Sequence, residues 1–194
     1  MRVGVLALQG DVREHSATLR ALGVEPVAVR RVEHLEGLSG IILPGGESTA
    51  IAHLLSTSGL RVPLAQAIGS GLDVFGTCAG LILLSRHVLD GRADQWSYGA
   101  LDVEVRRNGY GRQVASFETT LAVRGLGEVP GVFIRAPKIE SWGESVDVLA
   151  THDHGDGPFA VLVRQGSVWG CAFHPELTSD TRVHALFVSS LADR

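Results

Sequence analysis

The first half of the chain repeats one pattern: a short apolar run, a turn, and a segment whose apolar residues have helical spacing. The apolar runs lie at residues 3–8, 24–30, 38–46 and 72–77. The helical segments between and after them lie at residues 11–23, 48–59, 64–71 and 78–88. Continuous apolar runs predict buried strands. Their alternation with helices predicts an α/β protein, with a mostly parallel sheet covered by helices on both faces.

The second half of the chain has a different texture. After residue 95, short apolar or alternating segments predict strands, several of them antiparallel, at residues 99–108, 116–123, 131–137, 146–153, 159–166 and 168–176. A last helix is expected over residues 179–192. No repeat, low-complexity segment or linker interrupts the chain, so we expect one domain over residues 1–194.

Composition narrows the classes of function. Apolar residues make up 45% and charged residues 20% of the chain, and the net charge is −4. This balance is typical of soluble globular proteins and does not indicate a nucleic-acid or membrane partner. No uninterrupted apolar stretch reaches the roughly 18 residues of a membrane span, and the N-terminus does not resemble a secretory signal. We therefore expect a cytoplasmic protein. Cys78 and Cys171 could form a disulfide, but in that compartment thiols stay reduced.

The segment DVFGTCAG, residues 73–80, places a cysteine between glycines at the end of an apolar run. Gly76 and Gly80 permit a tight strand-to-helix turn, which projects the side chain of Cys78 outward. A helix that starts there favours the thiolate, and the amide of Ala79 could face a developing oxyanion. The alternative is a small buried cysteine that fills a strand–helix joint. The segment alone does not decide between these interpretations.

The segment CAFHPEL, residues 171–177, offers a base for such a nucleophile. His174 and Glu176 are two residues apart, so both side chains point to one face if the segment is extended, and Pro175 favours that geometry. A carboxylate beside an imidazole fixes its tautomer and stabilises the imidazolium. The alternative, a surface His-Pro turn with a solvated glutamate, is the commoner situation for such a segment. Cys171, three residues before His174, is expected in the core.

The segment ILPGGES, residues 42–48, is a third candidate loop after an apolar strand. Its consecutive glycines could present backbone N–H groups to an anion, and Gly46 is our candidate for a second oxyanion donor. The alternative is a plain strand–helix turn capped by Ser48. The loop lacks the lysine and spacing of a phosphate-binding P-loop.

Together these segments resemble a known family. LPGGEST, FGTCAGLILL and FHPEL are similar to motifs of the class I, triad-type glutamine amidotransferases. GVLALQGDVREH, RRNGYGRQVASFE, GVFIRAPKI and GCAFHPELTSDTRVHALFV resemble the glutaminase subunits of pyridoxal 5′-phosphate synthases within that family. The resemblance implies the three-layer amidotransferase fold. It also implies that L-glutamine is hydrolysed to glutamate and ammonia through a thioester on Cys78, with His174 and Glu176 completing the triad. Gly46 and Ala79 would hold the oxyanion, and no metal or cofactor is required.

The resemblance also implies where glutamine binds. The matching residues are Gly46, Glu47, Ser48, Arg107, Ile134 and Arg135. Arg107 would meet the α-carboxylate, because a guanidinium suits a planar carboxylate. Arg106 stands where relatives often have an acidic residue. Without the motif, both arginines are better interpreted as a solvated strand edge.

Members of this subfamily work with a separate barrel-fold synthase subunit, and this implies a heteromeric complex. The synthase combines the ammonia with a pentose phosphate and a triose phosphate to build pyridoxal phosphate, which is vitamin B6 biosynthesis. This chain has no expected second domain that would consume ammonia, which fits a separate partner. The LQGD loop, residues 8–11, is our candidate for sensing that partner.

Three other functions compete with this interpretation. The chain could be the glutaminase of an imidazole or nucleotide pathway, but residues 106–113 and 133–137 argue against it. It could be a related cysteine peptidase or hydrolase, although PGGES together with HPE favours glutamine chemistry. It could also be an inactive regulatory subunit, against which the intact Cys-His-Glu set argues. The remaining histidines receive no role: His15, His34, His53, His87, His152, His154 and His184.

Overall fold

The computed structural model describes residues 1–91, 95–107, 109, 116–155 and 157–192. Its strands are β1 (Arg2–Leu6), β2 (Glu25–Val29), β3 (Gly40–Leu43), β4 (Asp73–Thr77), β5 (Ser85–Val88), β6 (Leu101–Arg106), β7 (Ser116–Val123), β8 (Gly127–Ile134), β9 (Lys138–Trp142), β10 (Asp147–Asp153), β11 (Pro158–Gln165) and β12 (Val168–Cys171). Its helices are α1 (Val12–Ala21), α2 (Ser48–Thr57), α3 (Arg61–Gly69), α4 (Ala79–Leu84) and α5 (Arg182–Ala192), with short 3-10 helices η1 (Val32–Leu35) and η2 (Pro175–Leu177).

A central sheet organises the fold. Within the described residues it has seven strands in the order β10-β11-β12-β4-β3-β1-β2. The pairs from β12 through β2 are parallel, whereas β11 pairs antiparallel with both β10 and β12. The predicted mostly parallel sheet with added antiparallel strands is therefore confirmed.

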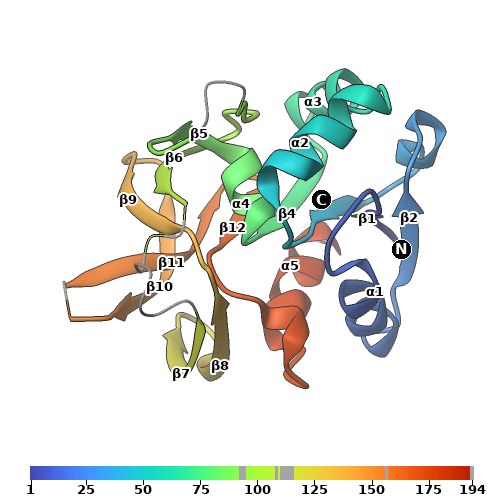
Figure 1. Ribbon diagram of the computed structural model, residues 1–194. Coiled ribbons are helices and arrows are strands. Elements are labelled where there is room, and N and C mark those ends of the chain that lie inside the picture. Colours follow the sequence, from blue (N-terminus) through green and yellow to red (C-terminus); the bar gives the residue numbers. More distant parts are fainter. Residues whose placement is uncertain (92–94, 108, 110–115, 156, 193–194) are drawn as a thin grey trace.

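Helices cover both faces of this sheet, as the strand order requires. The chain moves from β1 to β2 in one direction across the sheet and from β3 to β4 in the other, so right-handed crossovers put α1 and α2 on opposite faces. Figure 1 shows α2, α3 and α4 on one side and α1 and α5 on the other. On the α5 side the Phe187 ring lies 5.5 Å from that of Phe75 in β4. No helix in the described ranges is long and apolar enough to cross a bilayer.

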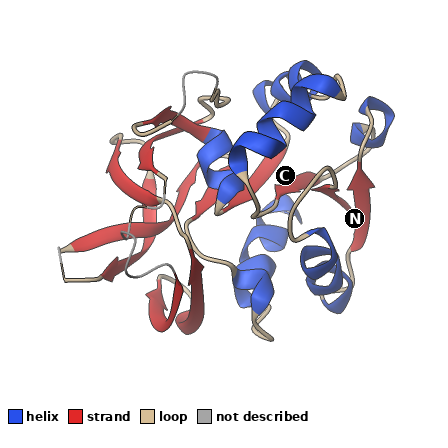
Figure 2. Ribbon diagram, viewed as in Figure 1, coloured by secondary structure: helices blue, strands red, loops and turns tan. Residues whose placement is uncertain are grey.

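Two smaller sheets flank the central one (Figure 2). One has the order β5-β6-β9, and the other is the hairpin β7-β8. Stacked rings hold the hairpin together: Phe117 and Phe133 lie with centroids 4.5 Å apart. At the base of this hairpin, the carbonyl of Val132 accepts a hydrogen bond of 2.7 Å from the amide of His174. The hairpin therefore fixes the backbone of a residue that the sequence singled out.

The structure corrects two sequence-based expectations outside the site. The helix expected over residues 78–88 ends at Leu84, and β5 follows directly. Ser85 already has a non-helical backbone, with ψ 154°, and residues 85–88 leave the helix to pair with β6. The sequence also missed β9, which pairs antiparallel with β6.

Candidate active site

The candidate residues meet at the carboxyl ends of the parallel strands. Because β1, β3 and β4 run parallel in one sheet, the loops that follow them share an edge. A cavity of about 270 Å³ opens there. It is lined by Asp11, Gly46, Glu47, Ser48, Cys78, Ile82, Arg107, Ile134, Arg135, His174 and Leu177. The lining contains every residue that the sequence assigned to glutamine binding, together with the candidate nucleophile and base.

Cys78 lies on a strained turn between β4 and α4. Its backbone has φ 48° and ψ −102°, a conformation that costs energy for a residue with a side chain. Close packing enforces the turn: a Cβ on Gly80 would collide with the carbonyl oxygen of Leu43 in β3. The amide of Cys78 also donates to the carbonyl of Cys171 at 2.8 Å. The turn directs the thiol into the cavity, where its sulfur lies 3.9 Å from the carbonyl oxygen of Ile134.

His174 and Glu176 contact each other, but not in the extended geometry that the sequence predicted. β12 ends at Cys171, and the segment 175–177 forms the 3-10 helix η2. That turn brings the Glu176 carboxylate back toward its neighbour, so that Oε1 lies 2.7 Å from Nδ1 of His174. Both side chains are nearly fully buried, at 5% and 0% exposure. The contact leaves the second ring nitrogen of His174 available to the thiol.

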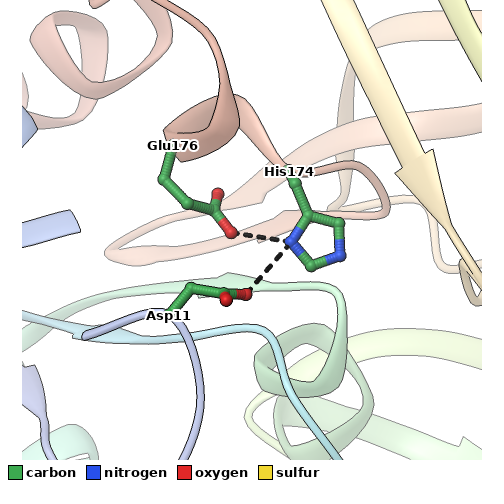
Figure 3. A group of neighbouring side chains, drawn as sticks. All are labelled: Asp11, His174 and Glu176. Carbon is green, nitrogen blue, oxygen red and sulfur yellow. Dashed lines mark hydrogen bonds and ion pairs between the residues drawn. The ribbon is translucent and has the colours of Figure 1, made fainter. Parts of the chain in front are cut away.

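Sequence reasoning missed a second carboxylate at this imidazole. Asp11, in the loop after β1, places Oδ2 3.4 Å from Nδ1 of His174 (Figure 3). Asp11 precedes α1 but makes no side-chain capping bond to it, so its carboxylate is free to face the imidazole. The available signal was position: an acidic residue after the first parallel strand lies at the same sheet edge as the loop after β4.

This cluster changes the charge state of its members. Burial alone would lower the pKa of His174, but the carboxylate of Asp11, the thiol of Cys78 and the carboxylate of Glu176 together raise it to about 12. The hydrogen bond from His174 in turn lowers the pKa of Asp11. Burial raises the pKa of Glu176, and the adjacent imidazolium opposes that rise. The site therefore holds His174 as an imidazolium between carboxylates on one side and the sulfur of Cys78 on the other.

A metal ion is a poor fit to the same side chains. Asp11, His174 and Glu176 have ligand-type atoms within 4.8 Å of one another, the spacing of a metal site. However, Nδ1 of His174 already makes a 2.7 Å hydrogen bond with Oε1 of Glu176, which occupies both of these atoms. The described residues therefore form a proton-holding cluster at this point, and its chemistry does not call for a metal.

The opposite end of the cavity carries the candidate carboxylate-binding arginine. Nη2 of Arg107 lies 3.2 Å from Oε1 of Glu47, and only 19% of the Arg107 side chain is exposed. The same Glu47 carboxylate accepts hydrogen bonds from the amides of Thr49 and Ala50 at the start of α2. Glu47 therefore caps this helix, so the alternative of a plain turn capped by Ser48 does not hold. Burial would raise the pKa of Glu47, but these amides, the Thr49 hydroxyl and Arg107 lower it.

The neighbouring arginine points elsewhere. Nε of Arg106 lies 2.9 Å from a carboxylate oxygen of Glu140 in β9 and does not line the cavity. The solvated strand-edge interpretation thus fits Arg106, while Arg107 turns into the cavity. The rest of this motif, Asn108 and residues 110–115, lies outside the described residues. Arg135 follows β8 with φ 45°, a second strained residue at the cavity.

The candidate oxyanion loop is held by the loop before α1. The side-chain oxygen of Gln9 accepts a hydrogen bond of 3.0 Å from the amide of Glu47. The amide of Asp11 donates to the carbonyl of Gly45 at 3.3 Å. Gly46 lies between these contacts at the cavity wall, and Ala79 is the first residue of α4, where backbone N–H groups lack helical acceptors.

Comparisons with known proteins identify the family of this chain. The model of the SNO glutamine amidotransferase family matches residues 5–193. A protein of Nocardia farcinica named "Pyridoxal 5'-phosphate synthase subunit PdxT" is 56% identical over 96% of this chain and 84% of its own length. One of the same name from Corynebacterium jeikeium is 52% identical over 100% of this chain and 98% of its own length.

Solved structures give the same picture. One described as "Crystal structure of glutamine amidotransferase" is 50% identical, covers 98% of each chain and superposes with a TM-score of 0.90. The structure of PurLQS from Thermotoga maritima covers 98% of each chain with a TM-score of 0.73. At 17% identity, that second likeness concerns the fold alone.

Proposed function

Because this chain belongs to the SNO glutamine amidotransferase family, we propose that it hydrolyses L-glutamine to L-glutamate and ammonia with Cys78, His174 and Glu176. The strongest support is the arrangement of these three residues. Cys78, on a strained strand-to-helix turn, shares a cavity with His174, and Nδ1 of His174 lies 2.7 Å from the buried carboxylate of Glu176. This arrangement matches the general nucleophile, base and orienter set of covalent acyl transfer.

In the acylation step Cys78 acts as a thiolate and His174 as an imidazolium. The Cys78 thiolate attacks the side-chain amide carbon of glutamine, and the carbonyl oxygen becomes an oxyanion held by the amides of Gly46 and Ala79. The His174 imidazolium gives its proton to the departing nitrogen, which leaves as ammonia when the C–N bond breaks. A γ-glutamyl thioester remains on Cys78.

In deacylation His174 must act as a base. Formation of the thioester favours this, because it removes one group that raises the pKa of His174, the Cys78 thiol. The imidazole then takes a proton from water as the water attacks the thioester carbon. The C–S bond breaks, glutamate leaves, and the thiolate–imidazolium pair is restored. Glu176 keeps the ring oriented through both steps.

Glutamine recognition falls to the other side of the cavity. We assign the α-carboxylate to Arg107, which in the free protein is paired with Glu47 at 3.2 Å. Substrate would share or take over that ion pair. Gly46, Glu47, Ser48, Ile134 and Arg135 would contact the rest of the substrate, and all five line the cavity.

The ammonia has a consumer in this proposal. The relatives at 52–56% identity are named as subunits of pyridoxal 5′-phosphate synthase, so we assign this chain to the same kind of heteromeric complex, in the cytoplasm, with a barrel-fold synthase subunit. Residues 1–194 would act as one glutaminase domain. Free ammonia would be protonated and diffuse away, so direct transfer to the partner fits the chemistry.

The loop of residues 8–11 is our candidate for sensing the partner. Gln9 contacts the oxyanion loop at the amide of Glu47, and Asp11 contacts both that loop and His174. A partner that moved this loop would therefore move the oxyanion donors and the base together. Gln9→Ala should weaken the stimulation of glutaminase activity by the synthase subunit. Stimulation equal to that of the wild type would count against this role.

The test of the proposed function is glutamate release from L-glutamine, with and without a pyridoxal 5′-phosphate synthase subunit. We expect partner-stimulated release by the wild type and none by Cys78→Ala. Cys171→Ala is the matched control, because Cys171 is fully buried in β12 and outside the cavity, so its activity should persist. Release by Cys78→Ala would refute the mechanism. If the synthase subunit does not change glutamate release, the assigned partner is refuted. If the wild type releases no glutamate under either condition, the chain is better interpreted as an inactive subunit.

A further inference from the structure

The triad carboxylate has a second oxygen that the mechanism leaves unused. Oε1 of Glu176 contacts His174, but Oε2 is buried and makes no hydrogen bond to any of the described residues. An ionised oxygen in such a position is costly unless a positive or hydrogen-bearing group faces it. Nε2 of His15 lies 3.6 Å from this oxygen. That distance is slightly longer than a hydrogen bond, and both side chains are fully buried.

His15 joins three elements behind the triad. It lies on α1, and its side chain has no exposure. Nε2 lies 3.1 Å from the hydroxyl of Thr77, the residue before the nucleophile, and Nδ1 lies 2.9 Å from Nε2 of His184 on α5. One ring therefore contacts the last residue of β4, which precedes Cys78, and α5, and it lies 3.6 Å from Glu176.

The placement of protons follows from counting donors and acceptors. Burial lowers the pKa of both His15 and His184, so both rings are neutral, and each carries one N–H. Nδ1 of His184 has no partner among the described residues. If that nitrogen carried the proton, a donor would be buried unsatisfied, whereas a bare nitrogen there costs less. The His184 proton therefore lies on Nε2 and is donated to Nδ1 of His15, which places the His15 proton on Nε2.

We propose that His15 is a positioning residue of the triad: its Nε2–H faces the free oxygen of Glu176 and keeps this carboxylate ionised and turned toward His174. His184 sets the tautomer that makes this possible. The Thr77 hydroxyl lies within hydrogen-bonding distance of the same N–H, which links His15 to the residue before Cys78. The proposal rests on the proposed role of Glu176 and deepens it, because it names what supports the carboxylate from behind.

Several titratable groups face Glu176 and set its charge. They are Asp11 before α1, His15 on α1, His174 beside η2, and the buried Cys171 of β12. Burial and the like charge of Asp11 raise the pKa of Glu176, while the hydrogen bond and charge of His174 lower it. A donor facing the carboxylate favours its ionised form and lowers its pKa further. Loss of the His15 N–H should therefore raise the pKa of Glu176.

Two amide substitutions separate a positioning role from simple packing. In His15→Gln the terminal NH₂ reaches the place of Nε2 and can still face Glu176. In His15→Asn the shorter NH₂ reaches only the place of Nδ1, which bonds His184 and not the carboxylate. His15→Leu removes both polar atoms and replaces His15→Asn if that variant does not fold. Leu19→Ala, one turn further along α1 in the core, is the control for lost packing.

The measurement is an infrared titration of the protonated-carboxyl band of Glu176, identified as the band that Glu176→Gln removes. We expect its midpoint to rise by about one pH unit in His15→Asn or His15→Leu, and to stay near the wild-type value in His15→Gln and Leu19→Ala. Equal midpoints in all variants, or equal shifts in His15→Gln and His15→Asn, would overturn the proposal.

The titration needs no substrate, so its failure is distinct from failure of the proposed function. If the wild type hydrolyses glutamine with a synthase subunit, kcat/KM can be measured against pH. The apparent pKa of its acid limb should then be higher in His15→Asn than in the wild type, by the same amount as the midpoint of the infrared band. A hydrolysing wild type without that shift refutes only the role of His15. If the wild type never hydrolyses glutamine, the proposed function is refuted, but the infrared titration still tests the role of His15.

Discussion

The second carboxylate at the imidazole gives a prediction with a magnitude. At the 3.4 Å that separates Asp11 Oδ2 from His174 Nδ1, unit charges interact by about 5 kcal/mol at an effective dielectric constant of 20 and by about 1 kcal/mol in water. The Asp11 side chain is 33% exposed, which places the pair between these limits, at about 2 kcal/mol. Asp11→Asn should lower the free energy of unfolding by that amount near neutral pH.

The pH window follows from the two pKa shifts. The pKa of Asp11 is lowered in the fold, so its contribution is present above its unfolded value of 3.8 and is lost as pH falls through the lowered value. The pKa of His174 is raised from 6.5 to about 12, so its contribution is complete below 6.5 and is lost as pH rises toward 12. The cost of Asp11→Asn should therefore be complete above about pH 5, be lost as pH falls through the lowered pKa of Asp11, and persist as pH rises until folded His174 loses its proton.

The assay is urea unfolding of a double-mutant cycle that combines Asp11→Asn with His174→Gln. The coupling isolates the pair from the weaker interaction of Asp11 with the start of α1. Asp147→Asn is the matched control: its partner Arg124 lies 3.2 Å away, but both side chains are more than half exposed, so its cost should be near zero. A coupling between Asp11 and His174 below about 0.5 kcal/mol would refute the reasoning, because that is the size of an exposed ion pair.

The other predictions concern the substrate end, the nucleophile turn and the stability of the fold. Arg107→Ala should raise KM for glutamine about tenfold or more in steady-state assays with a synthase subunit, while Arg106→Ala, which removes a strand-edge ion pair, should change it little. Gly80→Ala should lower the free energy of unfolding by about 2 kcal/mol or more, because its Cβ would collide with a backbone carbonyl of β3. Gly69→Ala has open space and should not destabilise, and equal urea midpoints for the two would contradict the packing argument. Finally, wild-type stability should fall as pH rises above 6.5, because folded His174 retains its proton; His174→Gln should flatten this slope in urea titrations.

The fold follows from local sequence signals to a large extent. Apolar runs that end at glycines predict the parallel strands, because a strand buried on both faces needs apolar residues throughout. The failure at residues 85–88 has a tertiary cause that local patterns of hydrophobicity do not report. There the chain leaves the helix to pair with β6 in a second sheet.

The candidate site divides in the same way. Cys78 and the pair His174 and Glu176 are visible in the sequence because each lies in a short segment with its own geometry. Asp11 and His15 are not, because their contacts join α1 and its preceding loop to segments more than 150 residues away. A buried histidine on an apolar helix face has the same pattern whether it packs only or faces a carboxylate.

The loop proposed to bind glutamine shows a second feature that residue preferences do not report. Ser48 fits the residue preference of a helix N-cap, yet Glu47 caps α2 and also holds Arg107. Only the tertiary position of Arg107 brings these two roles together on one carboxylate. Residue preferences at a helix start report the local backbone and not the partner across the cavity.

The central claim is that a γ-glutamyl thioester forms on Cys78, and intact-protein mass spectrometry tests it most directly. The chain would be mixed with a synthase subunit and L-glutamine, quenched in acid during turnover, and digested to locate the adduct. We expect the added mass of one glutamyl group on the peptide that contains Cys78, absent from Cys78→Ala and retained in Cys171→Ala. Glutamate release with no such adduct, or with the adduct on another residue, would contradict it.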